Sequence, residues 1–88
     1  MNTDIPAIPI VTDHVTPEIA AHVLWHFGRG GYQPGSFTEA LLVAFARADI
    51  HNMLALRRGF PGYFEAMYLA QEHVHGIKHL QEIAGGKS

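Results

Sequence analysis

The chain has 88 residues, of which 48% are apolar and 16% are charged, and its formal net charge is −2. This length predicts one domain, and the absence of cysteine excludes a disulfide framework and a cysteine-based zinc site. The small negative charge argues against a protein that binds nucleic acid through a basic face. So few charges on a small chain indicate that part of its surface is covered by another protein, most simply by a second copy.

Residues 1–15 are expected to form an extended N-terminal arm. Pro6 and Pro9 remove backbone donors, and each favours extended geometry in the residue before it. Branched apolar side chains recur along the arm: Ile5, Ile8, Ile10, Val11 and Val15. The arm either frays as a free terminus or packs on a neighbouring subunit. The sequence leaves both alternatives open.

The sequence indicates a cytoplasmic protein with no membrane association. The first residues lack the basic start and the long apolar run of a secretory signal. Nowhere does an apolar run approach the roughly 20 residues that span a bilayer. The lack of cysteine agrees with a reducing compartment.

The first predicted helix begins at Thr16-Pro17, where threonine can cap and proline suits the first helical position. It ends at Gly28 or at Gly30-Gly31. Its core stripe follows the helical repeat: Ala20, Val23, Leu24 and Phe27. Trp25 lies off this stripe and faces either a partner or the N-terminal arm. In the loop that follows, Tyr32 is expected to pin the chain to the body of the protein.

Two short helices are expected next. Ser36 and Glu39 form an S-x-x-E pattern that predicts a capping box, and the helix runs to about residue 48. Asp49 can cap a third helix over residues 50–58, which Gly59 terminates. The second helix has a broad apolar face: Phe37, Leu41, Leu42, Ala44, Phe45, Ala46 and Ala48.

Pro61 begins a fourth helix whose apolar pattern continues to about residue 83. Gly76 lies inside this pattern and predicts either a weak point in one long helix or a kink. Residues 85–88 are expected to form a disordered tail. The predicted fold is therefore all-α, with a small four-helix domain over residues 16–84 and an extended N-terminal arm.

Seven histidines raise the question of a metal site. His22 and His26 are spaced i, i+4, and Glu72, His75 and His79 would share one stripe of a continuous helix. Helical di-iron bundles use an E-x-x-H motif, but they need further carboxylates that face inward. The other candidate carboxylates are better explained as first-turn helix residues: Glu18, Glu39 and Glu65. We expect no metal and no cofactor, and keep a histidine-based metal-binding bundle as the third-ranked alternative.

Enzymatic activity has little support in the sequence. No nucleophile-elbow or phosphate-binding motif is present, and Ser36 already has a capping role. A second alternative is a DNA-associated regulator in which the second and third helices form a helix-turn-helix. Its recognition helix would carry Arg57 and Arg58 at its far end, whereas such helices contact bases near their N-terminal part. We therefore expect no enzyme and disfavour nucleic acid as a partner.

One pattern of residues lies in the middle of the chain: Gly31-x-Gln33-Pro34-Gly35-Ser36-Phe37, Leu41-Leu42, Ala48-Asp49, Asn52, Leu56 and Gly59-Phe60-Pro61. This pattern resembles small helical proteins encoded by bacteriophages of actinobacteria. The matching residues span about a third of the chain. The resemblance implies a setting, the cytoplasm of an infected bacterium, and carries over no catalytic residue.

These observations favour a non-enzymatic phage-type protein that acts through protein–protein contacts. We expect it to self-associate, with a bacterial host protein as a further candidate partner. The candidate contact residues are aromatic side chains and arginines, because these dominate interface energies: Trp25, Tyr32, Arg57, Arg58, Tyr63 and Tyr68. Each of these aromatic residues also has an alternative role in core packing.

Overall fold

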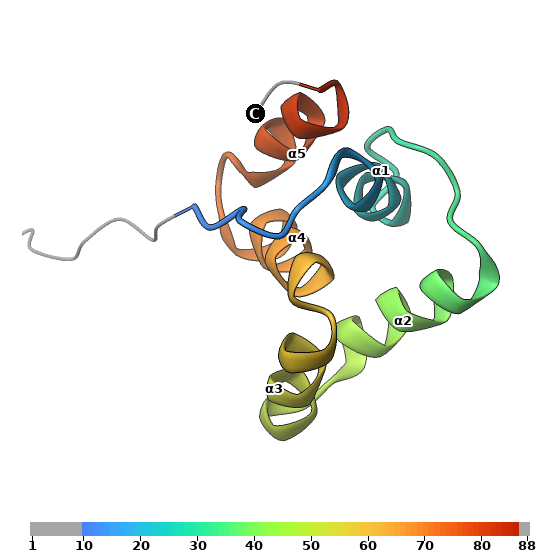
Figure 1. Ribbon diagram of the computed structural model, residues 1–88, viewed down its shortest axis with the longest axis vertical. Helices are drawn as coiled ribbons and strands as arrows, with labels where there is room; N and C mark the ends of the chain where they lie inside the picture. Colours follow the sequence, from blue (N-terminus) through green and yellow to red (C-terminus); the bar gives the residue numbers. More distant parts are fainter. Residues whose placement is uncertain (1–9, 87–88) are drawn as a thin grey trace, which may run out of the picture.

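The computed structural model describes residues 10–86, and within them the chain forms five α-helices and no strand. The helices are α1 (Pro17–His26), α2 (Ser36–Arg47), α3 (Ile50–Gly59), α4 (Pro61–Glu72) and α5 (Gly76–Ala84) (Figure 1). The predicted all-α class is confirmed. The helix count differs by one because the last predicted helix is divided in two.

The division between α4 and α5 lies just before Gly76, where the sequence predicted a weak point or a kink. His73 is extended, and its Nδ1 accepts a hydrogen bond from the backbone N–H of His75 at 3.1 Å. A Cβ atom at Gly76 would lie 1.7 Å from the backbone oxygen of Leu69. Gly76 is therefore the position where α5 approaches the end of α4 closely, and the local turn is stabilised by a histidine.

Two of the predicted helix caps are confirmed. The Thr16 hydroxyl accepts a hydrogen bond from the backbone N–H of Ile19 at 3.1 Å, at the start of α1. At the start of α3, the Asp49 carboxylate accepts one from the N–H of Asn52 at 2.8 Å. Both side chains satisfy a backbone donor that the first turn of a helix leaves without an intrahelical partner.

The capping box predicted at Ser36 is wrong. Gly35 is the N-cap of α2, and its carbonyl accepts from the N–H of Glu39 at 3.0 Å. Ser36 is therefore the first helical residue, one position too late to cap. The Glu39 carboxylate instead accepts a hydrogen bond from the side-chain amide of Gln33 at 2.9 Å, which ties the loop to the helix.

The core lies where α1, α4 and α5 meet, and α2 covers one side of it (Figure 1). Buried side chains from these four helices form one cluster: Ala20, Val23, Leu24, Leu41, Leu42, Phe45, Ala66, Met67, Leu69, Leu80 and Ile83. The stripe predicted for α1 is confirmed, with Phe27 packed at the edge of the cluster. Helix α3 packs on α4 and buries no side chain completely.

Helix α2 is less buried than its sequence predicted. Its buried side chains are Leu41, Leu42 and Phe45, whereas Phe37 is 67% exposed, and Ala44 and Ala46 are exposed as well. The predicted face was too broad because α2 contacts the rest of the protein along one side only. The ring of Phe37 lies 6.0 Å from the ring of Phe60, at the edge of the core.

The described part of the predicted arm, residues 10–15, packs on α4 of its own chain (Figure 1). The backbone N–H of His14 donates to the Glu65 carboxylate at 2.9 Å. A Cβ atom at Gly62 would lie 2.4 Å from the backbone oxygen of His14, so glycine permits this close approach. Residues 1–9 of the arm and residues 87–88 of the predicted tail lie outside the described residues.

None of the helices within residues 10–86 has both the length and the apolar character needed to cross a bilayer.

Candidate functional site

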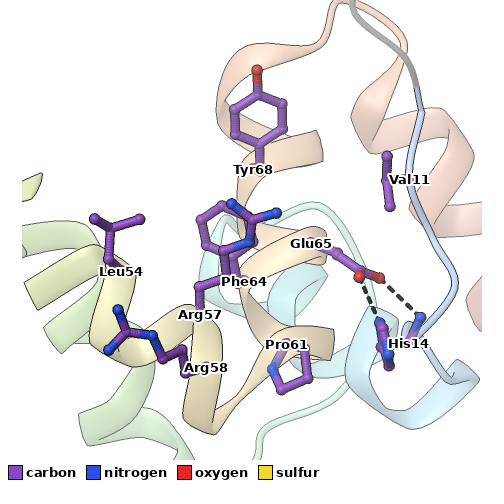
Figure 2. Close-up of a pocket in the computed structure, with 9 residues that line it drawn as sticks. All are labelled: Val11, His14, Leu54, Arg57, Arg58, Pro61, Phe64, Glu65 and Tyr68. Atoms are coloured by element: carbon purple, nitrogen blue, oxygen red, sulfur yellow. Dashed lines mark hydrogen bonds and ion pairs between the residues drawn. The ribbon is translucent and has the colours of Figure 1, made fainter.

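A groove of about 650 Å³ lies between α3 and α4, with the segment before α1 along one side (Figure 2). Nine residues line it: Val11, His14, Leu54, Arg57, Arg58, Pro61, Phe64, Glu65 and Tyr68. The three from α3 are spaced i, i+3, i+4, and the four from α4 are spaced i, i+3, i+4, i+7. Each helix therefore presents a single face to the groove.

Aromatic rings from α4 form the floor of the groove. The rings of Phe64 and Tyr68 are stacked, with centroids 6.1 Å apart. The guanidinium carbon of Arg57 lies 5.2 Å from the centroid of the Phe64 ring (Figure 2). A cation–π contact of this kind is worth about 0.5–1 kcal/mol at an exposed site. It holds Arg57 across the floor, while Leu54 and Val11 add apolar surface on opposite sides.

The single carboxylate in the groove is already engaged. One oxygen of Glu65 accepts from the backbone N–H of His14 at 2.9 Å, and the other lies 2.7 Å from Nδ1 of the same histidine. The Glu65 side chain is only 10% exposed. This contact joins α4 to the segment before α1, and among the described residues no arginine lies within salt-bridge distance of the nearly buried Glu65 carboxylate. From the sequence, Glu65 was explained only as a residue of the first helical turn, and its contact with His14 was not predicted.

Both arginines of the groove lack a carboxylate partner among the described residues. Within residues 10–86, the only contact at salt-bridge distance joins His14 to Glu65, and it is an ion pair only when the histidine is protonated. Arg57 and Arg58 are exposed on the last turn of α3, where a cation also favours the helix dipole. The groove is therefore locally positive although the whole chain carries a formal charge of −2.

A second cluster of aromatic side chains surrounds His22, which is 7% exposed. Its Nδ1 lies 2.8 Å from the hydroxyl of Tyr63, and the two rings are parallel. Tyr32 meets the His22 ring edge-on at 5.3 Å, so this residue does contact the body of the protein as predicted. Burial raises the pKa of the Tyr63 hydroxyl, and the side chain of Thr38 acts in the opposite direction. The cluster joins α1, α4 and the loop before α2.

The six predicted contact residues therefore separate into three places. Arg57, Arg58 and Tyr68 come together in the groove, whereas Tyr32 and Tyr63 belong to the cluster around His22. Trp25 is exposed on α1. The sequence missed the other lining residues, which are Val11, His14, Leu54, Pro61, Phe64 and Glu65. The helical spacing of the lining residues on α3 and on α4 was visible in the sequence. The sequence did not show that these two helix faces lie opposite each other.

The histidine pairs do not assemble into a metal centre. Because the chain turns between α4 and α5, Glu72 and His79 lie on different helices, and His75 precedes α5. His22 is buried against Tyr63, while the ring of His26 meets Phe27 edge-on. In the described part of the chain, no group of three or more histidine, cysteine, aspartate or glutamate residues could hold a metal ion.

The helices proposed as a helix-turn-helix are joined by Ala48 and Asp49. The packing partner of α3 is α4, and its two arginines line the groove between these helices. The arginines thus lie beside apolar and aromatic side chains rather than on a separate basic face.

Comparison of the chain with protein-family models, with curated proteins and with solved structures found no match. The resemblance to proteins of actinobacterial phages therefore stays a prediction.

Proposed function

We propose that the protein is a non-enzymatic interaction module that binds a segment of another protein in the groove between α3 and α4. The observation that carries this proposal is an aromatic floor beside two arginines that have no carboxylate partner among the described residues. Aromatic side chains and arginine contribute most of the energy at protein interfaces. If the phage resemblance holds, the first candidate source of the segment is a bacterial host protein.

An elongated ligand fits the groove better than a compact small molecule. Leu54 is 42% exposed, and Val11 and Tyr68 are exposed to a similar degree. Sites for small molecules usually bury most of the ligand surface. A groove whose walls are themselves open to solvent instead resembles the surfaces on which proteins bind extended or helical peptide segments.

Selection from a random peptide library tests this function. Peptides enriched on the wild-type protein should lose at least about tenfold in affinity on the Leu54→Arg variant, because the new side chain fills and further charges the groove. Val43→Arg is the matched control, since Val43 is an equally exposed apolar residue on α2 outside the groove. Equal binding of the enriched peptides to Leu54→Arg and wild type would place the binding site elsewhere.

Self-association is the second candidate function, favoured by large apolar side chains exposed on α2 and α3. Phe37 and Ile50 are each 67% exposed. A second copy that covers these side chains would remove them from water, which also fits the low charge fraction. Sedimentation velocity at micromolar concentration should detect a dimer that Ile50→Lys weakens. The control is Val74→Lys in the turn before α5, and a wild-type monomer throughout would contradict self-association.

A further inference from the structure

We infer that the segment bound by the groove is acidic, with aspartate or glutamate carboxylates beside an apolar or aromatic side chain. This inference rests on the proposed function and specifies the chemistry of the partner. Three features of the groove carry it: two arginines available for a ligand, a carboxylate that is already engaged, and an apolar floor.

The charged side chains of the groove favour an anionic ligand. Arg57 and Arg58 have no ion-pair partner among residues 10–86. Glu65 does not supply one, because neither arginine lies within salt-bridge distance of its carboxylate, which contacts His14 and is nearly buried. A cationic ligand would meet only this nearly buried carboxylate in the lining, whereas an anionic ligand would meet two guanidinium groups. The charges of the groove therefore complement an acidic partner.

The contact of Arg57 with Phe64 leaves the arginine able to bind an anion. Its guanidinium carbon lies over the Phe64 ring, 5.2 Å from the ring centroid. Contact with a ring face uses none of the five N–H donors of a guanidinium as hydrogen bonds, so they stay available to a ligand. A carboxylate can then accept two parallel hydrogen bonds from a group that is already oriented. Because the aromatic contact restricts the side chain beforehand, less conformational entropy is lost on binding.

The apolar surface of the groove calls for an apolar side chain in the ligand as well as carboxylates. Leu54 and Arg58 lie on one side of the groove, and Val11 lies on the opposite side beyond the α4 floor (Figure 2). A fully hydrophilic acidic peptide would leave this apolar surface in contact with water. A leucine or an aromatic residue next to the carboxylates would bury it, which is favourable in proportion to the apolar area removed from water.

A nucleic acid is the competing anionic macromolecule, and the groove suits it less well. Duplex DNA binding commonly uses on the order of 6–10 phosphate contacts. Here only two arginines line the groove, and the other basic residues of the described chain lie outside it: Arg29, Arg47 and Lys78. The net charge of −2 would also oppose a long polyanion.

Fluorescence anisotropy with four labelled probes tests the inference. The first probe is a peptide of about ten residues in which glutamates alternate with leucine and phenylalanine. In the second probe every glutamate is replaced by glutamine, and in the third leucine and phenylalanine are replaced by serine. The fourth is a single-stranded oligonucleotide. We expect the first peptide to bind at least about tenfold more tightly than each of the others.

Variants with matched charge locate the binding. Arg57→Gln/Arg58→Gln should weaken binding of the acidic–apolar peptide at least about tenfold, because both guanidinium groups are lost. Arg29→Gln/Arg47→Gln removes the same net charge from outside the groove, and it should change affinity by no more than about twofold. Circular dichroism of both double variants checks that the helices are retained.

Different binding results would overturn the acidic partner alone or the interaction groove as well. Equal affinity for the glutamate and glutamine peptides, with both lost on Leu54→Arg, would overturn the acidic partner and leave the interaction groove in place. Equal weakening by the two double variants would show a general charge effect and overturn the inference. Tighter binding of the oligonucleotide would overturn both proposals. If none of the peptides binds, the inference is wrong, and the library selection decides the function.

Discussion

In the part of the molecule formed by α1, α4 and α5, the helices share buried side chains, whereas α3 lies at the edge and buries none completely. Leu69 and Leu80 are almost fully removed from water, while Leu54 and Ile50 on α3 remain exposed. Apolar side chains are present in both regions, but those of α3 are at most partly buried. The exposed ones include Leu54, which lines the proposed groove.

The two regions also differ in what holds their helices in place. Tertiary packing fixes α1, α4 and α5, which approach closely enough to require glycine at Gly76. Helix α3 is held by the local cap of Asp49, by the contact of Arg57 with Phe64 on α4, and by partial packing of Met53 and Leu56. Helices with few buried contacts tend to open locally before the whole domain unfolds.

The largest difference between the regions should appear when a leucine is truncated in each. Leu80→Ala should lower the free energy of unfolding by about 2–5 kcal/mol, because it removes a fully buried side chain and leaves a cavity. Leu54→Ala should cost less than about 1 kcal/mol, since much of that side chain is already in water. Urea denaturation of both variants measures the two values. Similar losses would mean that α3 belongs to the core as fully as α5.

A second comparison uses the glycines at the ends of α3 and α5. Gly76→Ala should destabilise the protein by about 1–3 kcal/mol, because the added Cβ overlaps the Leu69 carbonyl and must push α4 and α5 apart. Gly59→Ala is the matched control, since no atom lies within 4 Å of a Cβ built there. It should leave stability unchanged or raise it by a few tenths of a kcal/mol. Thermal denaturation followed by circular dichroism measures both changes, and a harmless Gly76→Ala would contradict the tight turn before α5.

Features set by neighbouring residues were predictable from the sequence. The starts of α1, α3 and α4 follow from Thr16-Pro17, Asp49 and Pro61, because a cap or a proline acts within its own turn. The capping box predicted at Ser36 is not formed, although the sequence has the S-x-x-E pattern. The adjacent Gly35 is the N-cap instead, a position that glycine also occupies readily.

Features set by distant residues could not be predicted in the same way. The sequence indicated Arg57, Arg58 and Tyr68 as contact residues, but their meeting in one groove depends on how α3 packs on α4. The contact between His14 and Glu65 joins residues 51 positions apart. Helical periodicity says which side chains share a face, and it does not say which faces meet.

The smallest expected effect tests whether α3 depends on local interactions. Asp49→Ala removes the acceptor of the Asn52 N–H and should cost about 1 kcal/mol. The matched control is Ser36→Ala, at a position that the structure makes the first residue of α2 rather than its cap. That change should stay within about 0.5 kcal/mol, as for a surface substitution without a special role.

Hydrogen exchange distinguishes a local effect of Asp49→Ala from a global one. If α3 opens as a separate unit, its amides should exchange faster in the variant, by about fivefold for 1 kcal/mol, while those of α5 change less. Equal acceleration in α3 and α5 would mean that the two regions unfold together. A loss of about 1 kcal/mol in the free energy of unfolding for Ser36→Ala would instead indicate that Ser36 caps α2. Acceleration confined to α3 would mean that the helix lining one side of the groove opens more readily than the core. A ligand bound in the groove should then slow the exchange of the α3 amides more than that of the α5 amides.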